Sequence, residues 1–514
     1  MNHVMGVDIG TQSTKAVLVR ADGHIVAQAS QAYQVETPKP LWAQQWPDVW
    51  LDAVGLSIRG VLAESGVDAA SVKSLCISSL YGGSGIPVDA SGAVLHPCLI
   101  WMDRRAQDEV EWVRKNVDVE RLMAITGNGV DSYYGYTKML WLREKMPAVW
   151  QRTALFLPPN SYVIAQFTGE VAVDHSSAGN IGGVYDLAAR NWSDEALTML
   201  GIPRSMMPAR LVESSAVVGP LRADWAAKLG LRAGTPVVAG GVDAAVATLA
   251  AGAAQPGKHV AMIGTSMCWG TIRQGVDAHH GLISMPHVFR GAQDLYVFGG
   301  AITAGASVTW FRETFCQTEI AAGQEQGIDP HVLLERDAAP LPPGADGLLF
   351  LPYLMGERSP VWDAQASGCF IGLGLHHGRA HLYRAVLEGV SMALRHNIEA
   401  GARGVATLDD HLVVVGGASH SDLWMQIIAD VTGRPVHTIA EDVEASLGAA
   451  MLAALGVGLI DDDAVRRGWV QPVQRALPNA AAHAAYDALF QHYQAAYTAL
   501  RSVMHGLRQL PASA

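Results

Sequence analysis

Apolar and polar residues alternate in blocks at the start of the chain. Residues 4–9 form an apolar, strand-like run that leads directly into a polar turn at residues 10–14. An apolar run rich in β-branched residues resumes at 15–19, and Asp22-Gly23 then supplies a turn signal. This order predicts a strand, a Gly/Ser/Thr turn and a second strand.

The same order recurs near the middle of the chain. Residues 260–263 are apolar, residues 264–266 form the polar turn, and residues 269–272 resume the apolar pattern. Two such hairpins favour an internal duplication with a boundary near residues 235–255. The alternative is coincidence, because Gly/Thr hairpin turns are common in β-rich proteins.

Helical and strand patterns alternate through the rest of the chain. Leu382, Val386, Val390 and Leu394 fall four residues apart and mark one face of a helix. The β-branched run at 412–415 predicts a strand, and Ser421 then stands at the N-cap of another apolar helix. Strands alternating with helices in this way predict α/β domains. The Ala-rich tail beyond Asp461 predicts terminal helices.

Length and composition limit the class of protein. The chain has 514 residues, which exceeds the usual size of a single core and predicts two or more domains. Half of the residues are hydrophobic and 16% are charged, which excludes a disordered or fibrous chain. The net charge is −12 and no Lys/Arg-rich run occurs, so we expect neither nucleic acid nor an anionic membrane surface as a partner.

Cysteine usage and the apolar runs predict a cytoplasmic protein. The five cysteines are scattered and form no CxxC pair, which is typical of reduced thiols in a cytosol. The first residues lack the basic and apolar regions of a signal peptide. The longest apolar run, 445–460, consists largely of Ala and Gly and predicts a buried helix rather than a membrane span.

The first turn carries residues that suit a phosphate group. Backbone N–H groups of a Gly-containing turn, together with hydroxyl groups and Lys15, can cradle phosphate oxygens. Asp8, at the end of the preceding strand, could hold a hydrated Mg²⁺. The turn is not a Walker A loop, because no GK[ST] opens a helix there. An ordinary hairpin with a solvated lysine is the alternative interpretation.

Three further segments have both a chemical and a structural interpretation. Asp243, which follows two glycines, could accept the proton of an attacking hydroxyl group, or it could cap a helix. The Gly416-Gly417-Ala418 segment could admit a nucleotide close to the backbone, or it could serve close packing of a strand on a helix. Glu357 and Arg358, in an unusual loop, could take part in catalysis, but a structural ion pair is the favoured interpretation.

Taken together, these features resemble the FGGY carbohydrate kinases, and among them the xylulokinases. The most specific match is GCFIGL at 368–373 followed by HLYRAVLE at 381–388, which fits the family's C-terminal signature. The loop PYLMGERSP at 352–360 is close to the PYLSGERTP of xylulokinases. Further segments occur in the family's order along nearly the whole chain: VDIGTQSTK, IWMDRR, GGVDAA, IGTS, AGASVTWFRE and VVVGGASHSDLWMQIIADVTGRPV.

The resemblance implies an α/β fold of two ribonuclease-H-like domains of the actin/Hsp70 ATPase type, with the active site in the cleft between them. We expect a sugar-binding domain at residues 1–245, which carries the first phosphate loop, and a nucleotide-binding domain at residues 246–514. ATP and Mg²⁺ are the implied cofactors. Facing polar hairpins could grip the triphosphate, and closure of the domains could exclude water.

The resemblance also assigns roles to individual residues. Asp243 takes the position of the catalytic base and also contacts the substrate, and Asp8 lies near the metal, to which it binds through water. The nucleotide-binding positions are Gly10, Thr11, Gln12, Gly264, Thr265, Gly305, Thr309, Gly417, Ala418 and Ser421. The other sugar-pocket positions are Tyr81, Trp101 and Asp103.

The implied activity is ATP-dependent phosphorylation of a small sugar hydroxyl, with D-xylulose as the first candidate. The chain departs from the xylulokinases at residues 78–85, where the usual Gln-Met-His-Gly stretch is missing, and Gly135 replaces a small hydroxyl residue or proline. L-ribulose, a tetritol or glycerol are therefore alternative substrates. An actin- or Hsp70-like ATPase and an inactive sugar-binding regulator are alternatives of another class. Dimeric relatives suggest a homodimer.

Overall fold

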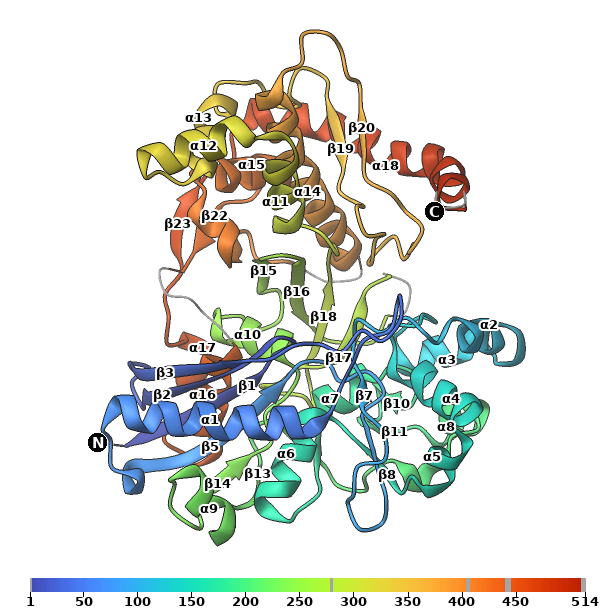
Figure 1. Ribbon diagram of the computed structural model, residues 1–514, viewed down its shortest axis with the longest axis vertical. Helices are drawn as coiled ribbons and strands as arrows, with labels where there is room; N and C mark the ends of the chain where they lie inside the picture. Colours follow the sequence, from blue (N-terminus) through green and yellow to red (C-terminus); the bar gives the residue numbers. More distant parts are fainter. Residues whose placement is uncertain (1, 278–280, 404–406, 440–444, 510–514) are drawn as a thin grey trace.

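Two mixed β-sheets organise the protein, one in each of two domains (Figure 1). The computed structural model describes residues 2–277, 281–403, 407–439 and 445–509. The first domain is built around a sheet of six strands. In spatial order these strands are β13 (Val217–Pro220), β14 (Pro236–Val238), β5 (Val72–Ser79), β1 (His3–Ile9), β2 (Ser13–Arg20) and β3 (Ile25–Ala32).

The second domain is built around a sheet of seven strands. In spatial order these are β17 (Ile283–Pro286), β18 (Leu295–Gly299), β16 (Met267–Arg273), β15 (His259–Ile263), β21 (Leu412–Val415), β22 (Val436–Thr438) and β23 (Val473–Ala476). Short two-stranded pairs lie outside both sheets: β4 (Gln44–Gln45) with β7 (Cys98–Leu99), β6 (Ile86–Val88) with β8 (Leu155–Leu157), β9 (Val173–Asp174) with β12 (Leu211–Val212), β10 (Tyr185–Asp186) with β11 (Asn191–Trp192), and β19 (Leu349–Leu351) with β20 (Cys369–Ile371).

The two predicted hairpins occupy equivalent places in the two sheets. β1 pairs antiparallel with β2, with Ile9 opposite Thr14, and β15 pairs antiparallel with β16, with Ile263 opposite Met267. The first strand of each hairpin also has a parallel neighbour, β5 in one domain and β21 in the other. The predicted α/β class and the repeated hairpin are therefore confirmed.

Helices pack on both sheets and around them. Those of the first domain are α1 (Pro47–Ser65), α2 (Gln107–Asn116), α3 (Val119–Thr126), α4 (Gly135–Lys145), α5 (Pro147–Arg152), α6 (Pro159–Thr168), α7 (His175–Asn180), α8 (Asp194–Leu200), α9 (Ala223–Leu229) and α10 (Asp243–Ala250). Those that follow are α11 (Gly305–Phe315), α12 (Gln317–Gln326), α13 (Pro330–Ala338), α14 (Arg379–Ala402), α15 (Asp422–Thr432), α16 (Ala445–Gly456), α17 (Asp462–Arg467) and α18 (Ala480–Arg508).

Several local predictions are confirmed. α14 contains the four apolar residues spaced four apart, and Ser421 caps α15 by accepting a hydrogen bond from the N–H group of Trp424 at 3.0 Å. All five cysteines are free. Within the described ranges, no helix has the length and apolar character needed to cross a membrane. The tail beyond Asp461 includes β23 as well as helices, so the purely helical prediction there was wrong.

Helix α16 belongs late in the sequence but packs on the first sheet. Figure 1 shows it beside β1 and β5, and its residues from Ala445 to Ala454 are buried. Small residues allow this approach: a Cβ atom on Gly6 would lie 2.0 Å from the carbonyl oxygen of Ser446. A Cβ atom on Gly448 would likewise lie 2.1 Å from the carbonyl oxygen of Val246 in α10. The predicted boundary between residues 245 and 246 falls inside α10, and its position stays a prediction.

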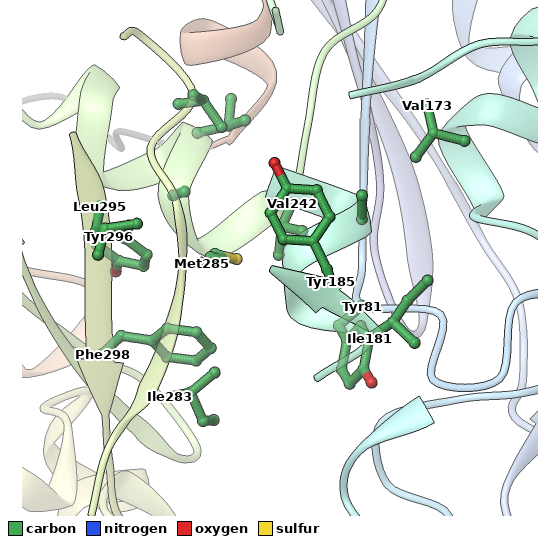
Figure 2. Packing of buried hydrophobic residues seen from close by; sticks show 14 of the residues in the cluster. Tyr81, Val173, Ile181, Tyr185, Val242, Ile283, Met285, Leu295, Tyr296 and Phe298 are labelled. Atoms are coloured by element: carbon green, nitrogen blue, oxygen red, sulfur yellow. The ribbon is translucent and has the colours of Figure 1, made fainter. Parts of the chain in front are cut away.

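The two domains also meet along the edge strand β17. Asn128 of the first domain donates to the carbonyl oxygen of Ser284 at 2.9 Å and accepts from its N–H group at 2.9 Å. Figure 2 shows apolar side chains of β17 and β18 facing side chains from the first domain, including Ile181 and Tyr185. The hydrophobic core therefore continues from one domain into the other on this side of the molecule.

The close packing of β1 on α16 yields a prediction about stability. Replacing Gly6 with alanine should lower the free energy of unfolding by on the order of 3 kcal/mol, because the new methyl group would overlap the backbone of Ser446. Denaturant unfolding measures this change. Gly129→Ala is the control, since a Cβ atom there meets no atom within 4 Å and should change stability by no more than about 0.5 kcal/mol. Equal stability of the two variants would contradict the packing argument.

Candidate active site

Two carboxylates that interact electrostatically lie where the first sheet ends. Asp8 lies near the end of β1, beside Ser78 of β5, whose hydroxyl donates to Asp8 Oδ1 at 2.8 Å. Asp243 begins α10, and the preceding residue, Val242, forms a bridge to Ser79 at the end of β5. Neighbouring strand ends therefore bring the two carboxylates together. Burial, and then repulsion from Asp8, raise the pKa of Asp243 to about 8.

The alternative interpretation of Asp243 as a helix cap does not fit this geometry. Val242 occupies the N-cap position of α10, and Asp243 is the first helical residue. Its Oδ1 accepts a hydrogen bond from the N–H group of Ala244, the next residue, at 2.7 Å. An N-cap side chain instead accepts from the second or third helical residue. The position of Asp243 therefore leaves its carboxylate close enough to Asp8 to interact with its charge, rather than spanning the first helical turn.

Side chains of the first domain brace the first turn. The N–H group of Gly10 donates to the carbonyl oxygen of Ser13 at 2.9 Å, and the Trp101 Nε1–H group donates to Thr11 Oγ1 at 3.0 Å. Tyr33 donates its hydroxyl to the carbonyl oxygen of Gly10 at 2.7 Å, and its N–H group donates to the carbonyl oxygen of Gln12. The sequence interpretation missed Tyr33, which lies two strands away in the sequence. The turn is thus held in one shape before any ligand arrives.

The second turn is joined to the start of α11. The carbonyl oxygen of Thr265 accepts from the N–H groups of Ala304 and Ala306 at 3.0 Å, and that of Gly264 accepts from Gly305 at 2.8 Å. A Cβ atom at Gly305 would lie 2.5 Å from the oxygen of Gly264, so only glycine fits this approach. The second turn and the start of α11 therefore form one hydrogen-bonded unit.

A cavity of about 820 Å³ opens beside this unit. Seven of the predicted nucleotide-binding residues line it: Gly264, Thr265, Gly305, Thr309, Gly417, Ala418 and Ser421. Gly10, Thr11 and Gln12 do not line it, because they belong to the first turn in the other domain. The walls also include Trp310, Asp329, His331 and Glu335 from α11 and from the region of α13, which the sequence interpretation did not identify.

The predicted sugar-pocket residues occupy two different environments. Trp101 is half-buried and contacts the first turn through Thr11. Asp103 is fully buried, and its oxygens accept hydrogen bonds from the N–H groups of Ala43 and Arg105 and from Nε of Arg105. This arrangement fixes the loop that presents Trp101, and a direct contact between Asp103 and a sugar stays a prediction.

Tyr81 lies in the 78–85 stretch, where the sequence departs from the xylulokinase pattern. Its hydroxyl accepts a hydrogen bond from the N–H group of Gly135 at 2.5 Å, and its ring lies 5.0 Å from that of Tyr133. Gly135 is required there, since a Cβ atom would lie 2.0 Å from the carbonyl oxygen of Gly83. The two departures from the xylulokinase pattern, near Tyr81 and at Gly135, therefore fit each other. A contact between Tyr81 and the sugar stays a prediction.

Glu357 and Arg358 do not form the predicted ion pair. Glu357 Oε1 instead accepts hydrogen bonds from the backbone N–H groups of Ile302, at 3.0 Å, and of Arg358, at 2.7 Å. Burial raises the pKa of the Glu357 carboxyl to about 7, and the neighbouring N–H groups and the Arg358 charge only partly oppose this rise. The prediction failed because the carboxylate has two backbone donors closer at hand.

The carboxylate pair suits a hard divalent cation. Among the described residues, no group of three or more His, Cys, Asp or Glu side chains is placed to hold a metal ion. Mg²⁺ needs fewer protein ligands than that, because it usually keeps several waters and binds one or two carboxylates together with phosphate oxygens. Asp8 and Asp243 supply such oxygen ligands, and their mutual repulsion is what a cation between them would relieve.

Comparisons with family models cover most of the chain. The model for the N-terminal domain of the FGGY family of carbohydrate kinases matches residues 3–250, and the model for the C-terminal domain matches residues 259–457. The two matches are separated by residues 251–258, the segment that follows α10.

Individual relatives match the chain from end to end. A xylulose kinase of Bacillus subtilis (strain 168) is 30% identical over 514 residues, covering 99% of this chain and 99% of the relative. A gluconokinase of Bacillus licheniformis is 30% identical over 464 residues, covering 90% of this chain and 88% of the relative. The crystal structure of a xylulose kinase from Rhodospirillum rubrum superimposes with a TM-score of 0.88 at 32% identity, covering 98% and 100% of the two chains.

The raised pKa of Asp243 predicts how stability responds to substitution. A carboxyl group whose folded pKa lies above its unfolded value destabilises the fold at every pH where the unfolded chain is ionised. Asp243→Asn removes that cost, so it should raise the free energy of unfolding at pH 7 in metal-free buffer by on the order of 1–3 kcal/mol. The gain should shrink as the pH falls below about 4, where the unfolded carboxyl is also protonated. Thermal and denaturant unfolding with EDTA measure it, and a loss of stability at pH 7 would contradict the electrostatic argument.

Proposed function

Because the chain belongs to the FGGY family of carbohydrate kinases, which use ATP to phosphorylate sugars on a ribonuclease-H-like fold, we propose that it phosphorylates D-xylulose to D-xylulose 5-phosphate. The observation that carries the mechanism is the half-buried Asp243 carboxylate at the start of α10, whose pKa is raised by burial and by the charge of Asp8. The names of the xylulose kinase relatives support the choice of sugar.

The proposed reaction begins with a sugar hydroxyl beside Asp243. The carboxylate accepts the hydroxyl proton as the sugar oxygen attacks the terminal phosphorus of ATP. Its raised pKa in the free protein makes it a stronger base than an exposed aspartate, once it is ionised. Asp8 and Asp243 would hold Mg²⁺, partly through water, and the ion would supply charge neutralisation at the triphosphate.

The two turns are proposed to divide the nucleotide between them. The cavity beside the second turn takes the adenosine end, with Gly417, Ala418 and Ser421 along one wall and Gly305 and Thr309 along another. The first turn, with Gly10, Thr11 and Gln12, then faces the terminal phosphate from the other domain. Backbone N–H groups in such turns bind anions without any conformational cost at the moment of reaction.

Closure of the two domains completes this arrangement. The hydrogen bonds of Asn128 to Ser284 and the apolar side chains in Figure 2 join the domains along β17. Rotation about this contact would bring the turns together over the sugar and exclude water, which limits wasteful hydrolysis of ATP. A homodimer and a cytoplasmic location remain predictions from the sequence.

A second substrate class has a specific observation in its favour. A gluconokinase is as similar in identity to this chain as the xylulose kinase of Bacillus subtilis, and the usual Gln-Met-His-Gly stretch is replaced by residues 78–85. The chemistry at the carboxylate pair would be the same for an aldonic acid as for a ketopentose. Only the pocket for the remaining hydroxyl or carboxylate groups would differ.

The proposed function is tested by measuring ADP release from Mg-ATP with D-xylulose, L-ribulose, tetritols, glycerol and D-gluconate. We expect D-xylulose to give the highest kcat/KM, and Asp243→Asn to lower kcat by a factor of about 10²–10⁴ through loss of the base. Asp224→Asn, which changes a half-exposed carboxylate on α9, is the control and should keep full activity. A clear preference for another substrate would contradict D-xylulose while keeping the role of Asp243. No sugar-dependent release would contradict the kinase mechanism itself.

The nucleotide cavity gives a separate prediction. Gly417→Ala places a methyl group where no protein atom lies within 4 Å, so it should change the free energy of unfolding by no more than about 0.5 kcal/mol. The same methyl group would occupy space assigned to adenosine, and it should raise the KM for ATP about tenfold with little change in the KM for the sugar. Gly305→Ala is the contrasting variant and should lose stability as well. An unchanged KM for ATP in Gly417→Ala would place the nucleotide elsewhere.

A further inference from the structure

A loop of the second domain contacts the first domain. It consists of residues 356–363, lies between β19 and β20, and in Figure 1 the chain there descends toward the first domain. Glu357 and Asp363 exchange two backbone hydrogen bonds, at 2.8 and 3.0 Å, which close the loop on itself. The hydroxyl of Ser359 accepts from the N–H group of Gly300 at 2.8 Å and so ties the loop to the end of β18.

The C-terminal helix holds the far end of the same loop. Asp363 Oδ2 accepts from the Tyr497 hydroxyl at 2.8 Å and lies 2.7 Å from His505 Nε2, and both residues belong to α18. On the side of the first domain, the Trp362 ring lies 6.1 Å from that of Tyr134. With one end anchored on α18 and the other on β18, the loop is a rigid support rather than a free segment.

Arg358 is the charged residue that this loop presents to the first domain. Its side chain is 8% exposed, and its Nε and Nη2 donate only to the carbonyl oxygens of Gly300 and Met267, each at 3.4 Å. Among the described residues, no group accepts a hydrogen bond from Nη1 and no carboxylate forms an ion pair with the guanidinium. A buried cation normally has an anionic partner. An anion from outside the chain could therefore pair with Arg358.

The guanidinium contacts residues that adjoin each of the two turns. Met267, whose carbonyl oxygen it contacts, directly follows the second turn, and the Trp101 ring, 6.0 Å away, is bonded to Thr11 of the first turn. Burial raises the pKa of the Cys268 thiol to about 11, while the charges of Arg358 and Asp243 act on it in opposite directions. Burial also raises the pKa of the Tyr133 hydroxyl, and the charges of Arg358 and Asp243 again act on that pKa in opposite directions. Arg358 and Asp243 thus act on the same two side chains.

We propose that Arg358 binds the phosphoryl group during its transfer and is a catalytic residue of the reaction. This inference rests on the proposed function. The sugar oxygen forms a bond to the terminal phosphorus, the bond from that phosphorus to the bridging oxygen breaks, ADP leaves, and the hydroxyl proton passes to Asp243. Negative charge spreads over the three phosphoryl oxygens in between, and a forked guanidinium is suited to bind two of them.

Charge matching decides between the phosphoryl group and the sugar as the ligand of Arg358. Ketopentoses, tetritols and glycerol carry no charge, so they would leave a buried cation without an anion. The transferred phosphoryl group is anionic in every case. The carboxylate of an aldonic acid is the competing anion, and it would make Arg358 a residue of substrate selection instead.

The test compares Arg358→Gln and Arg358→Lys with the wild-type enzyme, assayed with its best substrate. We expect Arg358→Gln to lower kcat by a factor of about 10²–10³, as expected for the loss of a donor to developing charge, with less than a threefold change in the KM for the sugar. Arg358→Lys should recover only part of this loss, because an ammonium group lacks the fork. Arg501→Gln, a 61% exposed cation near Asp363 at the far end of the same loop, is the matched control and should keep wild-type kcat.

A binding measurement separates catalysis from folding. ADP with aluminium fluoride mimics the phosphoryl group in flight, and we expect Arg358→Gln to weaken binding of this complex about a hundredfold in the presence of sugar while binding ADP alone like the wild type. Equal weakening of ADP and of the mimic would overturn the proposal by showing a structural defect. A raised KM for the sugar with unchanged kcat, or a loss confined to gluconate, would overturn it in favour of sugar recognition. A wild-type enzyme that is inactive with every substrate would contradict the proposed function. Weaker binding of the mimic, but not of ADP, by Arg358→Gln would still support the role of Arg358.

Discussion

The structure depends on holding two half-buried carboxylates, Asp8 and Asp243, near each other. Asp8 and Asp243 would separate if the end of β1 and the start of α10 could move apart. They cannot, because Val242 is bridged to β5 and because α16 packs on both β1 and α10. Gly6 and Gly448 let that helix approach so closely that a single methyl group would overlap backbone atoms. The packing of small residues thus maintains an electrostatic arrangement that is unfavourable on its own.

A site in which two carboxylates repel each other is suited to a reaction in which a cation, such as Mg²⁺, binds together with the substrate. Strained or repulsive groups persist where the surrounding structure fixes them, and they cluster at functional sites. Here the first turn, the second turn and the loop that carries Arg358 are each held by hydrogen bonds within their own domain. The protein therefore contributes positioning and charge, which is most of what phosphoryl transfer requires.

Local sequence patterns were sufficient to predict the hairpins β1–β2 and β15–β16, the helix α14 and the cap at Ser421, because each depends on residues close together in the chain. The family resemblance was needed to group Gly264, Gly305 and Gly417, which line one cavity although they are 153 residues apart at the extremes. Strand β23 was missed because three of its four residues are exposed and carry no apolar alternation.

The environment of Arg358 could not be predicted from the sequence, because it depends on contacts that form only in the folded chain. Adjacent opposite charges favour an ion pair, and only the fold shows that backbone N–H groups of Ile302 and Arg358 take the Glu357 carboxylate. In the same way, the burial of Asp103 behind Arg105 depends on a contact with Ala43, 60 residues earlier in the chain. Long-range contacts of this type decide which polar residues face a ligand and which serve the fold.

A crystal structure with Mg²⁺, a non-hydrolysable ATP analogue and D-xylulose would test the central claim most directly. The account predicts that the triphosphate lies between the turns at Thr11 and Thr265, with one sugar hydroxyl within hydrogen-bonding distance of the Asp243 carboxylate. A sugar bound with all its hydroxyl groups away from Asp243, or a triphosphate that contacts neither turn, would contradict it.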